Sequence, residues 1–204
     1  MQVNEQDNKW DLFFNILNNP DKNIIALDIK IDMLGVGRRN IVKLFEENGK
    51  TQDDIDNLLL VNYNVEQLDK IITPEDRIER LFINFCNPWN KKAGHKKHRL
   101  TYPKQLILYR EFLKAEGEVY FKTDDDDLFE DSLRYFPAAG FEIVWMTRDL
   151  HANEPADNLR TEHEAMFSSQ GIPIKGLIAR MLPELPDNEA TRDALASRAR
   201  HPAV

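Results

Sequence analysis

The short segment Asn87-Pro88-Trp89 combines three residue types that suit the recognition of a planar, amino-bearing ring. The side-chain oxygen of Asn87 can accept hydrogen bonds from ring N–H groups, and Pro88 stiffens the turn. The indole of Trp89 offers a stacking face, which contributes about 1–3 kcal/mol per base. The tripeptide would also suit an ordinary turn with a core tryptophan, so the segment alone leaves both interpretations open.

A cluster of positive charge follows directly in residues 91–99, which hold five Lys or Arg and two His but no acid. Its cationic side chains are Lys91, Lys92, Lys96, Lys97 and Arg99. The whole chain has a net charge of −8, so the remaining residues carry −13. Screening limits distant charges to a Debye length of about 8 Å, and such a cluster can therefore bind phosphates in an acidic protein. A solvated surface loop explains the cluster equally well.

Two more polar residues follow apolar runs that have the composition of strands. Asp28 ends the run IIAL, and Asn64 follows LLLVNY. Ligands of open α/β sheets bind at the carboxyl ends of the strands, so Asp28 could accept from a ribose diol and Asn64 could face an adenine edge. Either residue alone is weak evidence, because polar residues commonly end strands.

The acidic run after the apolar segment EVYF admits more than one role. Asp124 would contact a substrate or, with its neighbours, bind Mg²⁺ or Ca²⁺ through oxygen ligands. For residues 125–127 we favour a helix N-terminus, because a helical pattern follows and the helix dipole favours acids there. The segment TEHE at 161–164 is a poor metal site, since consecutive side chains diverge.

The elements that must position these residues alternate between strands and helices. Most of the apolar runs are nearly continuous, as in strands covered on both faces. They predict strands at 24–29, 58–62, 80–85, 118–123, 142–148 and 174–181, and helical patterns occupy 33–49, 103–117 and 126–140. The alternation predicts an α/β fold with a mostly parallel sheet, and the last two strands could pair antiparallel.

The composition indicates one globular domain, with 204 residues of which 42% are hydrophobic and 30% charged. No run of about 18 apolar residues occurs, and the polar N-terminus lacks the features of a signal peptide. Cys86 is the only cysteine, which rules out an internal disulfide and a multi-cysteine zinc site. We therefore expect a cytoplasmic protein without metal. We assign residues 1–181 to the domain and expect a loosely ordered tail at 182–204, with a weak helix in 188–200.

Three segments in order resemble one known family. They are NPDKNIIALDIK (19–30), INFCNPWNKKAGHKKHRL (83–100) with the later strand EVYFKTD, and TEHEAMFSSQGIPIKGLIAR (161–180). Together they resemble the bacterial tRNA (guanine-N7-)-methyltransferases, which carry an Asp/Asn-Pro-Trp turn, a basic run, a strand ending in Thr-Asp and a Thr-x-x-Glu segment. The resemblance covers most of the chain, and three motifs in order are more specific than any one of them.

The resemblance implies a Rossmann-like, S-adenosylmethionine-dependent methyltransferase that methylates N7 of guanine 46 in the tRNA variable loop. Asp28, Asn64 and Asn87 match cofactor-contacting positions, and Asn87 also matches the proposed catalytic position. The matches to substrate-contacting positions are Lys91, Asp124, Thr161, Glu162, His163 and Glu164. On this reading the RNA phosphates are contacted by Lys92, Lys96, Lys97 and Arg99, and the base stacks on Trp89.

Two departures from the family pattern matter. Asn87 replaces the usual Asp, which keeps the accepting oxygen but removes the charge. The family's first, central strand carries an acid and a Gly-rich loop that approaches the cofactor's methionine part, whereas residues 5–9 here read EQDNK and the first glycine is Gly35. The segment 9–15 resembles one that precedes that strand in some relatives. We expect a gap in the sheet, from a deletion, a gene fragment or a wrong start.

Three functions therefore remain open from the sequence. The first is the tRNA methyltransferase. The second is a non-catalytic RNA-binding remnant that keeps the basic loop, which the glycine gap favours. The third is another S-adenosylmethionine-dependent amino methyltransferase, because Asn-Pro-aromatic turns also serve exocyclic amines. The basic loop and the Thr-x-x-Glu segment favour the first over the third.

Overall fold

The computed structural model describes residues 21–155, 158 and 160–199, and it divides into two compact units. The first unit comprises residues 1–65 and 155–169, and the second comprises 66–154 and 170–204. Within the described ranges, short 3₁₀ segments connect the larger elements at Gln52–Asp54, Val65–Lys70, Pro74–Asp76 and Ala93–His98. No helix within the described ranges is long and apolar enough to cross a membrane.

The first unit is built on two parallel strands, β1 (Ile24–Asp28) and β2 (Leu58–Asn62). Their register pairs Ile24 with Leu58 and Asp28 with Asn62. Helix α2 (Ile31–Glu47) buries an apolar stripe of Ile41, Leu44 and Phe45, against which Ile24, Ile55 and Leu58 pack. The unit also contains α5 (Glu162–Ser169), a helix that the sequence patterns did not indicate.

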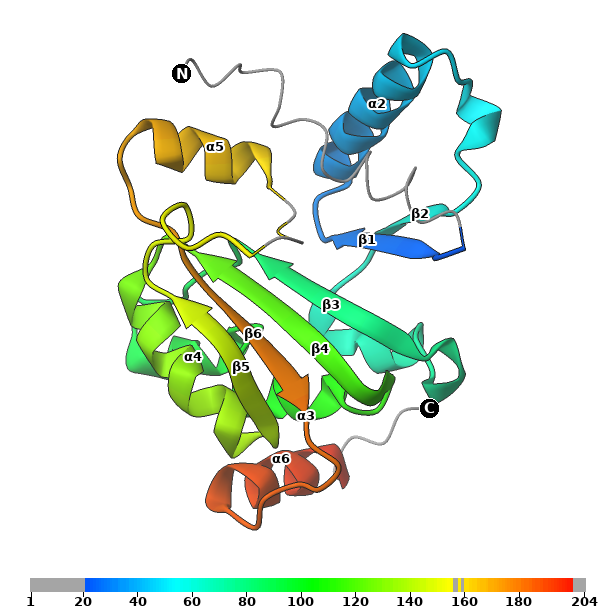
Figure 1. Cartoon of the computed structure of the whole chain (residues 1–204). Coiled ribbons are helices and arrows are strands. Elements are labelled where there is room, and N and C mark those ends of the chain that lie inside the picture. The colour runs from blue at the N-terminus through cyan, green and yellow to red at the C-terminus, as the bar shows by residue number, and fades with distance from the viewer. Residues whose placement is uncertain (1–20, 156–157, 159, 200–204) are drawn as a thin grey trace. The chain divides into compact units, whose positions relative to one another are not determined.

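The second unit holds a four-stranded sheet in the order β3-β4-β6-β5. Its strands are β3 (Ile78–Asn84), β4 (Leu113–Thr123), β5 (Phe141–Thr147) and β6 (Lys175–Met181). β3 and β4 are parallel, while β6 runs antiparallel to both of its neighbours, as the opposed arrow in Figure 1 shows. The expected antiparallel arrangement of the last two strands is confirmed.

Helix α4 (Asp126–Ala138) packs against β4, β5 and β6 and closes the core of this unit. Its Phe129 and Phe136 are fully buried, and Phe136 meets Phe141 of β5 edge to face with ring centroids 5.8 Å apart. Phe121 of β4 lies between them, 6.5 Å from the ring of Phe129. This aromatic cluster fixes the start of α4 relative to the end of β4.

The predicted helix at 103–117 is wrong in its second half. Helix α3 (Pro103–Tyr109) is short, and β4 begins at Leu113. Residues between Leu113 and Glu118 form a bulge, since the register with β3 jumps there and Glu116 has a positive φ of 60°. A Cβ at Gly117 would lie 2.9 Å from the carbonyl oxygen of Lys114, so this glycine permits a tight bulge instead of ending a helix.

The segment expected as a loose tail is folded over residues 182–199. Helix α6 (Glu189–Ala199) confirms the weak helix expected there, and it packs on α3 with Thr191 and Ala194 buried. Asn188 caps the helix through its bond with the Thr191 amide at 2.8 Å and donates to the Ala138 carbonyl at 2.9 Å. Arg110 adds bonds to the carbonyls of Leu182 and Gly140.

The strands described fall into two sheets of two and four strands. Within the described ranges β1 pairs only with β2, and β3 pairs on one side only, with β4. Gly35 and Gly37 lie in α2 and therefore do not form a strand-to-loop cradle. The segments 5–9 and 9–15 lie outside the described residues.

Candidate functional site

The turn after β3 carries Asn87 in an exposed position. The side-chain oxygen of Asn87 accepts a hydrogen bond from the Trp89 amide at 3.0 Å, which closes the turn across Pro88. Phe85 and Trp89 have positive φ values of 50° and 51°. Such left-handed conformations cost residues with side chains of order 1–3 kcal/mol each and cluster at functional sites. The turn is therefore a constrained structure that presents the Asn87 amide to solvent.

Trp89 lies at the surface with 37% of its area exposed, so the alternative of a core tryptophan does not apply. Its ring lies beside two imidazoles, with centroids 5.3 Å from His98 and 6.1 Å from His95. His98 in turn pairs with Glu66 at 3.1 Å. The indole thus has an exposed part and ring neighbours that limit its rotation.

The basic segment divides into exposed and engaged side chains. Lys91, Lys92 and Lys97 are exposed. Lys96 instead bonds to Asp131 at 2.7 Å and to Asp127 at 3.1 Å, and these bonds raise its pKa. Among the lysines of this segment, Lys91, Lys92 and Lys97 are therefore the exposed ones that are available to an anionic partner.

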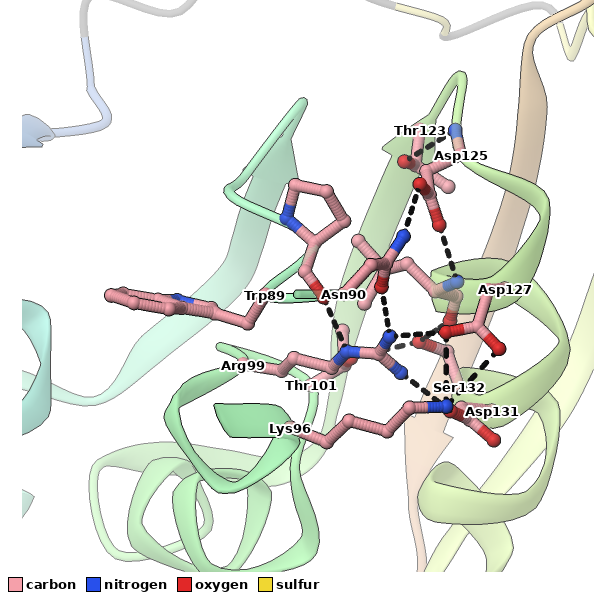
Figure 2. A network of polar contacts seen from close by, with 12 residues as sticks. Trp89, Asn90, Lys96, Arg99, Thr101, Thr123, Asp125, Asp127, Asp131 and Ser132 are labelled. Atoms are coloured by element: carbon pink, nitrogen blue, oxygen red, sulfur yellow. Dashed lines mark hydrogen bonds and ion pairs between the residues drawn. The ribbon is translucent and has the colours of Figure 1, made fainter. Parts of the chain in front are cut away.

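Arg99 is buried, with 1% of its area exposed, and Figure 2 shows its guanidinium at the centre of a polar network. Nε donates to the Pro88 carbonyl at 2.6 Å, and Nη1 donates to Asp131 at 2.5 Å. Nη2 donates to Asp127 at 2.7 Å and to the Asn90 side-chain oxygen at 2.5 Å. The expectation that Arg99 contacts RNA phosphates is thereby corrected, because its donors are directed into the protein.

The acidic run after β4 forms the N-terminus of α4, as favoured from the sequence. Asp125 is the N-cap, and its side chain accepts from the Leu128 amide at 2.7 Å and from Asn90 Nδ2 at 2.6 Å. Thr123 accepts from the Asp125 amide at 3.1 Å. Hydrogen bonds from Lys96 and Arg99 lower the pKa of Asp127. Burial by itself raises the pKa of Asp131, but its bonds to the same two cations outweigh burial, and the net shift is downward.

Asp124 lies beside this network and is half-buried. Its backbone carbonyl accepts from Lys175 Nζ at 2.9 Å, and the same ammonium pairs with Asp126 at 2.9 Å. The Lys175 side chain is only 7% exposed. The sequence patterns did not single out Lys175, since its role depends on β6 running antiparallel beside β4. The bond from Lys175 thus fixes the backbone of Asp124. Asp124 follows β4 as the Asn87 turn follows β3, and these strands are parallel neighbours.

In the first unit, Asp28 and Asn64 both lie at the carboxyl ends of parallel strands. Asp28 ends β1, where its side chain accepts from the Lys30 amide at 2.7 Å. Asn62 faces Asp28 in the register and donates to the Asp28 carbonyl at 3.0 Å. Asn64 follows β2 by two residues. Asn62 was missed in the sequence because it reads as the last residue of an apolar run.

The segment 161–164 begins α5. Thr161 accepts at Oγ1 from the Glu164 amide at 3.2 Å, and Glu164 is fully buried and bonds to Asn158 at 3.0 Å. The exposed His163 packs against Phe167 with centroids 4.7 Å apart. Glu162 is the first residue of the helix. Thr161 and Glu164 therefore stabilise the start of this helix, and His163 is exposed.

Within the second unit, the structure brings Asn87, Trp89, the exposed lysines and Asp124 to one strand-end region through the Arg99 network. Within the first unit, Asp28 and Asn64 share one strand end, and Thr161–Glu164 begins a separate helix. No group of three or more His, Cys, Asp or Glu side chains in the described part of the chain is arranged to hold a metal ion.

Comparison with known proteins adds a consistent set of relatives. Residues 16–177 match a sequence-family model described as "Putative methyltransferase". A protein of Clostridium beijerinckii named tRNA (guanine-N(7)-)-methyltransferase is 54% identical over 161 residues, which is 79% of this chain and 72% of that protein. One of the same name from Clostridium perfringens is 52% identical over 81% of this chain and 74% of that protein.

Among solved structures, the fold is similar to the 16S rRNA methyltransferase KamB. The TM-score is 0.56 and the identity 12%, covering 82% of this chain and 80% of the KamB chain. This likeness concerns the α/β fold alone.

Proposed function

Because the chain belongs to the tRNA (guanine-N7-)-methyltransferase family, we propose that it transfers a methyl group from S-adenosylmethionine to N7 of guanine 46 in the tRNA variable loop. The observation that carries the proposal is the match, at about half identity over most of the chain, to relatives bearing that name. The exposed Asn87 turn beside three exposed lysines is consistent with it.

The described residues fit the adenosine half of the cofactor. Asp28, at the end of β1, would accept hydrogen bonds from the ribose hydroxyls, and Asn64 would face the adenine. No glycine loop in the described ranges fits the methionine half, because Gly35 and Gly37 are helical. When bound, the cofactor supplies a methyl group already activated on a sulfonium sulfur.

The residues of the second unit would act on the acceptor base. Guanine N7 carries a free lone pair, so no strong base is needed and the protein's main task is alignment. The Asn87 oxygen would accommodate the positive charge that arrives on the purine, and Trp89 would stack on a base. Asp124 and residues 161–164 would contact the substrate. These roles are assigned from the family resemblance. Asn87, Trp89 and His163 are also exposed, whereas Glu164 is buried and would act by shaping the start of α5.

The RNA backbone would be held by the exposed lysines. Lys91, Lys92 and Lys97 each offer an ammonium group that neutralises a phosphate and releases its counterion. Such contacts position an RNA without reading its sequence. Lys96, which is bound to two carboxylates, would contribute less because it must first give up those partners.

A binding titration tests the cofactor assignment. Isothermal calorimetry with S-adenosylmethionine on the full chain should show saturable binding that Asp28→Ala weakens and Asp53→Ala, an exposed acid remote in sequence, leaves unchanged. If wild type shows no heat at millimolar cofactor while still binding tRNA, the second candidate stands instead. That candidate is an RNA-binding protein without catalysis, favoured by the missing glycine cradle.

A transfer assay tests the substrate. Tritium from labelled S-adenosylmethionine should enter tRNA that carries guanine at position 46, and a tRNA with adenine there should remain unlabelled. Equal labelling of both RNAs would show that the methylated site is elsewhere.

A further inference from the structure

The turn that presents Asn87 is tied to the second unit's core through the buried guanidinium of Arg99. Arg99 donates to the Pro88 carbonyl inside the turn and, on its opposite side, to Asp127 and Asp131 of α4 (Figure 2). The Arg99 side chain thus makes four hydrogen bonds, and its exposed fraction is zero. A phosphate ligand needs solvent-facing donors, whereas this geometry joins two strand-end segments.

A second bridge passes through Asn90 and shares one hydrogen bond with the guanidinium. Asn90 accepts from Arg99 at its oxygen and donates through Nδ2 to Asp125, the N-cap of α4. Lys96 adds a second cation, which pairs with Asp127 and Asp131. Asp127 and Asp131 each pair with Arg99, so the charge of this buried guanidinium is compensated. The bridge therefore holds the turn at a fixed position beside Asp124.

The turn itself needs such support. Trp89 has a positive φ of 51°, and Phe85 has one of 50°. Strained conformations of this kind persist only where surrounding contacts over-determine them. The bond from Arg99 Nε to the Pro88 carbonyl acts directly on the peptide unit that precedes Trp89. Loss of this bond removes one restraint on the backbone that orients the Asn87 amide.

We propose that Arg99 is a positioning residue, which locks the Asn87–Trp89 turn onto the N-terminal turn of α4 so that Asn87 and Asp124 meet the acceptor base in register. The expected effect of Arg99 on methyl transfer rests on the proposed function. The attachment of the turn to α4 through Arg99 does not. Lysine at this position keeps the charge and loses the fork of parallel donors, and it reaches only one or two of the four acceptors.

The test compares Arg99→Lys with Arg134→Lys in the full chain. Arg134 also pairs with Asp131, but its side chain is 73% exposed, and both residues lie on α4. Both variants are made in a background with Trp10→Phe and Trp145→Phe, which leaves Trp89 as the only indole. Acrylamide quenching then reports the order of the turn, thermal melting reports global folding, and steady-state kinetics give kcat and the KM for tRNA.

We expect Arg99→Lys to melt cooperatively, to expose Trp89 to more quenching, and to lower kcat by about tenfold or more with the KM for tRNA unchanged. Arg134→Lys should match the background in all these measurements. Wild-type quenching in Arg99→Lys would overturn the proposal, and so would raised quenching with an undiminished kcat. Should Arg99→Lys fail to fold, Asp127→Asn, at a half-exposed side chain, must produce the same pattern in weaker form. If the wild-type chain transfers no methyl group, the proposed function fails while quenching still decides whether the lock exists.

Discussion

At the scale of single residues, the oxygen of Asn87 has two acceptor sites, and the turn uses one of them for the Trp89 amide. The other site remains for a ring N–H or a cationic purine. An amide can fill this position because the turn needs only a neutral acceptor. A carboxylate would add charge to both contacts, and charge-assisted hydrogen bonds are roughly twice as strong as neutral ones.

Asn87→Asp should therefore raise kcat for methyl transfer by about tenfold, since it places a negative charge where positive charge arrives on the purine. Single-turnover rates at saturating tRNA measure the effect. Asn84→Asp, at the exposed end of β3 and outside the turn, is the control and should leave the rate unchanged. A decrease in Asn87→Asp would show that the amide nitrogen, and not the oxygen, faces the base.

The exposed lysines act through phosphate neutralisation, so their removal should appear in the salt dependence of tRNA binding. Replacing Lys91, Lys92 and Lys97 together by Ala should reduce the slope of log K against log salt by about 2–3, at 0.7–0.9 per lost contact. Filter binding at several salt concentrations measures the slope. Lys104→Ala, an exposed lysine on α3, should not change it, and an unchanged slope in the triple variant would exclude these lysines from the RNA contact.

At the scale of elements, the sequence predicted all six described strands within a few residues, because apolar runs and their polar ends mark buried strands directly. It placed the end of α3 wrongly, since helical periodicity continues past Tyr109 while Leu113 already pairs with Ile78. The burial of Arg99 could not be predicted from the sequence either. It depends on carboxylates from α4, 28 and 32 residues away in the chain, and side-chain type alone does not distinguish a buried cation from an exposed one.

The contact between the basic segment and α4 should make stability depend on pH. The pKa values of Asp127 and Asp131 are lowered from the ordinary value of 3.8. The two carboxylates therefore stabilise the folded protein fully above about pH 5, and this contribution is lost as the pH falls below about 3.8. Asp131→Asn should cost about 3–5 kcal/mol at pH 7, because it removes a partner of buried Arg99. The difference between wild type and variant should shrink toward pH 3 in urea titrations. Asp53→Asn is the control, and a difference that stays constant with pH would contradict the assignment.

Because α6 packs on α3, substitutions at its buried positions should lower the free energy of unfolding, although the composition of residues 182–204 predicts a loosely ordered segment. Ala194 is 2% exposed in this contact, whereas the neighbouring Leu195 is 48% exposed. Ala194→Arg should lower the free energy of unfolding by about 1–3 kcal/mol through overpacking. Leu195→Arg should be nearly neutral. Equal midpoints for the two variants in urea would mean that α6 is not docked in solution.

At the scale of the whole molecule, the described chain consists of two units with unequal cores. The second unit has a four-stranded sheet with a buried aromatic cluster, and the first has two parallel strands with one helix stripe packed on them. Two-stranded sheets are marginal without further support. The sequence also lacks a strand-glycine pattern before Gly35, whereas the α/β composition of both units was predictable from the alternation of apolar runs and helical patterns.

Amide hydrogen exchange should reveal this inequality. Amides of β1 and β2 should exchange faster than those of β4 and β6 by about 100-fold or more, as expected for subglobal opening a few kcal/mol below global unfolding. Mass spectrometry of peptides from the two units measures the rates. Addition of S-adenosylmethionine should slow exchange at Asp28 and Asn62 if the first unit binds the cofactor. Equal protection of both sheets without ligand would show that they unfold as one.

Cys86 gives the chain a natural chemical probe of the turn. It is the single thiol, it directly precedes Asn87, and burial raises its pKa to about 12. The thiol is therefore protonated at neutral pH while the segment keeps this structure, which makes its alkylation slow. The rate at which iodoacetamide labels this one sulfur would then measure how often the segment after β3 opens, without any substitution in the protein.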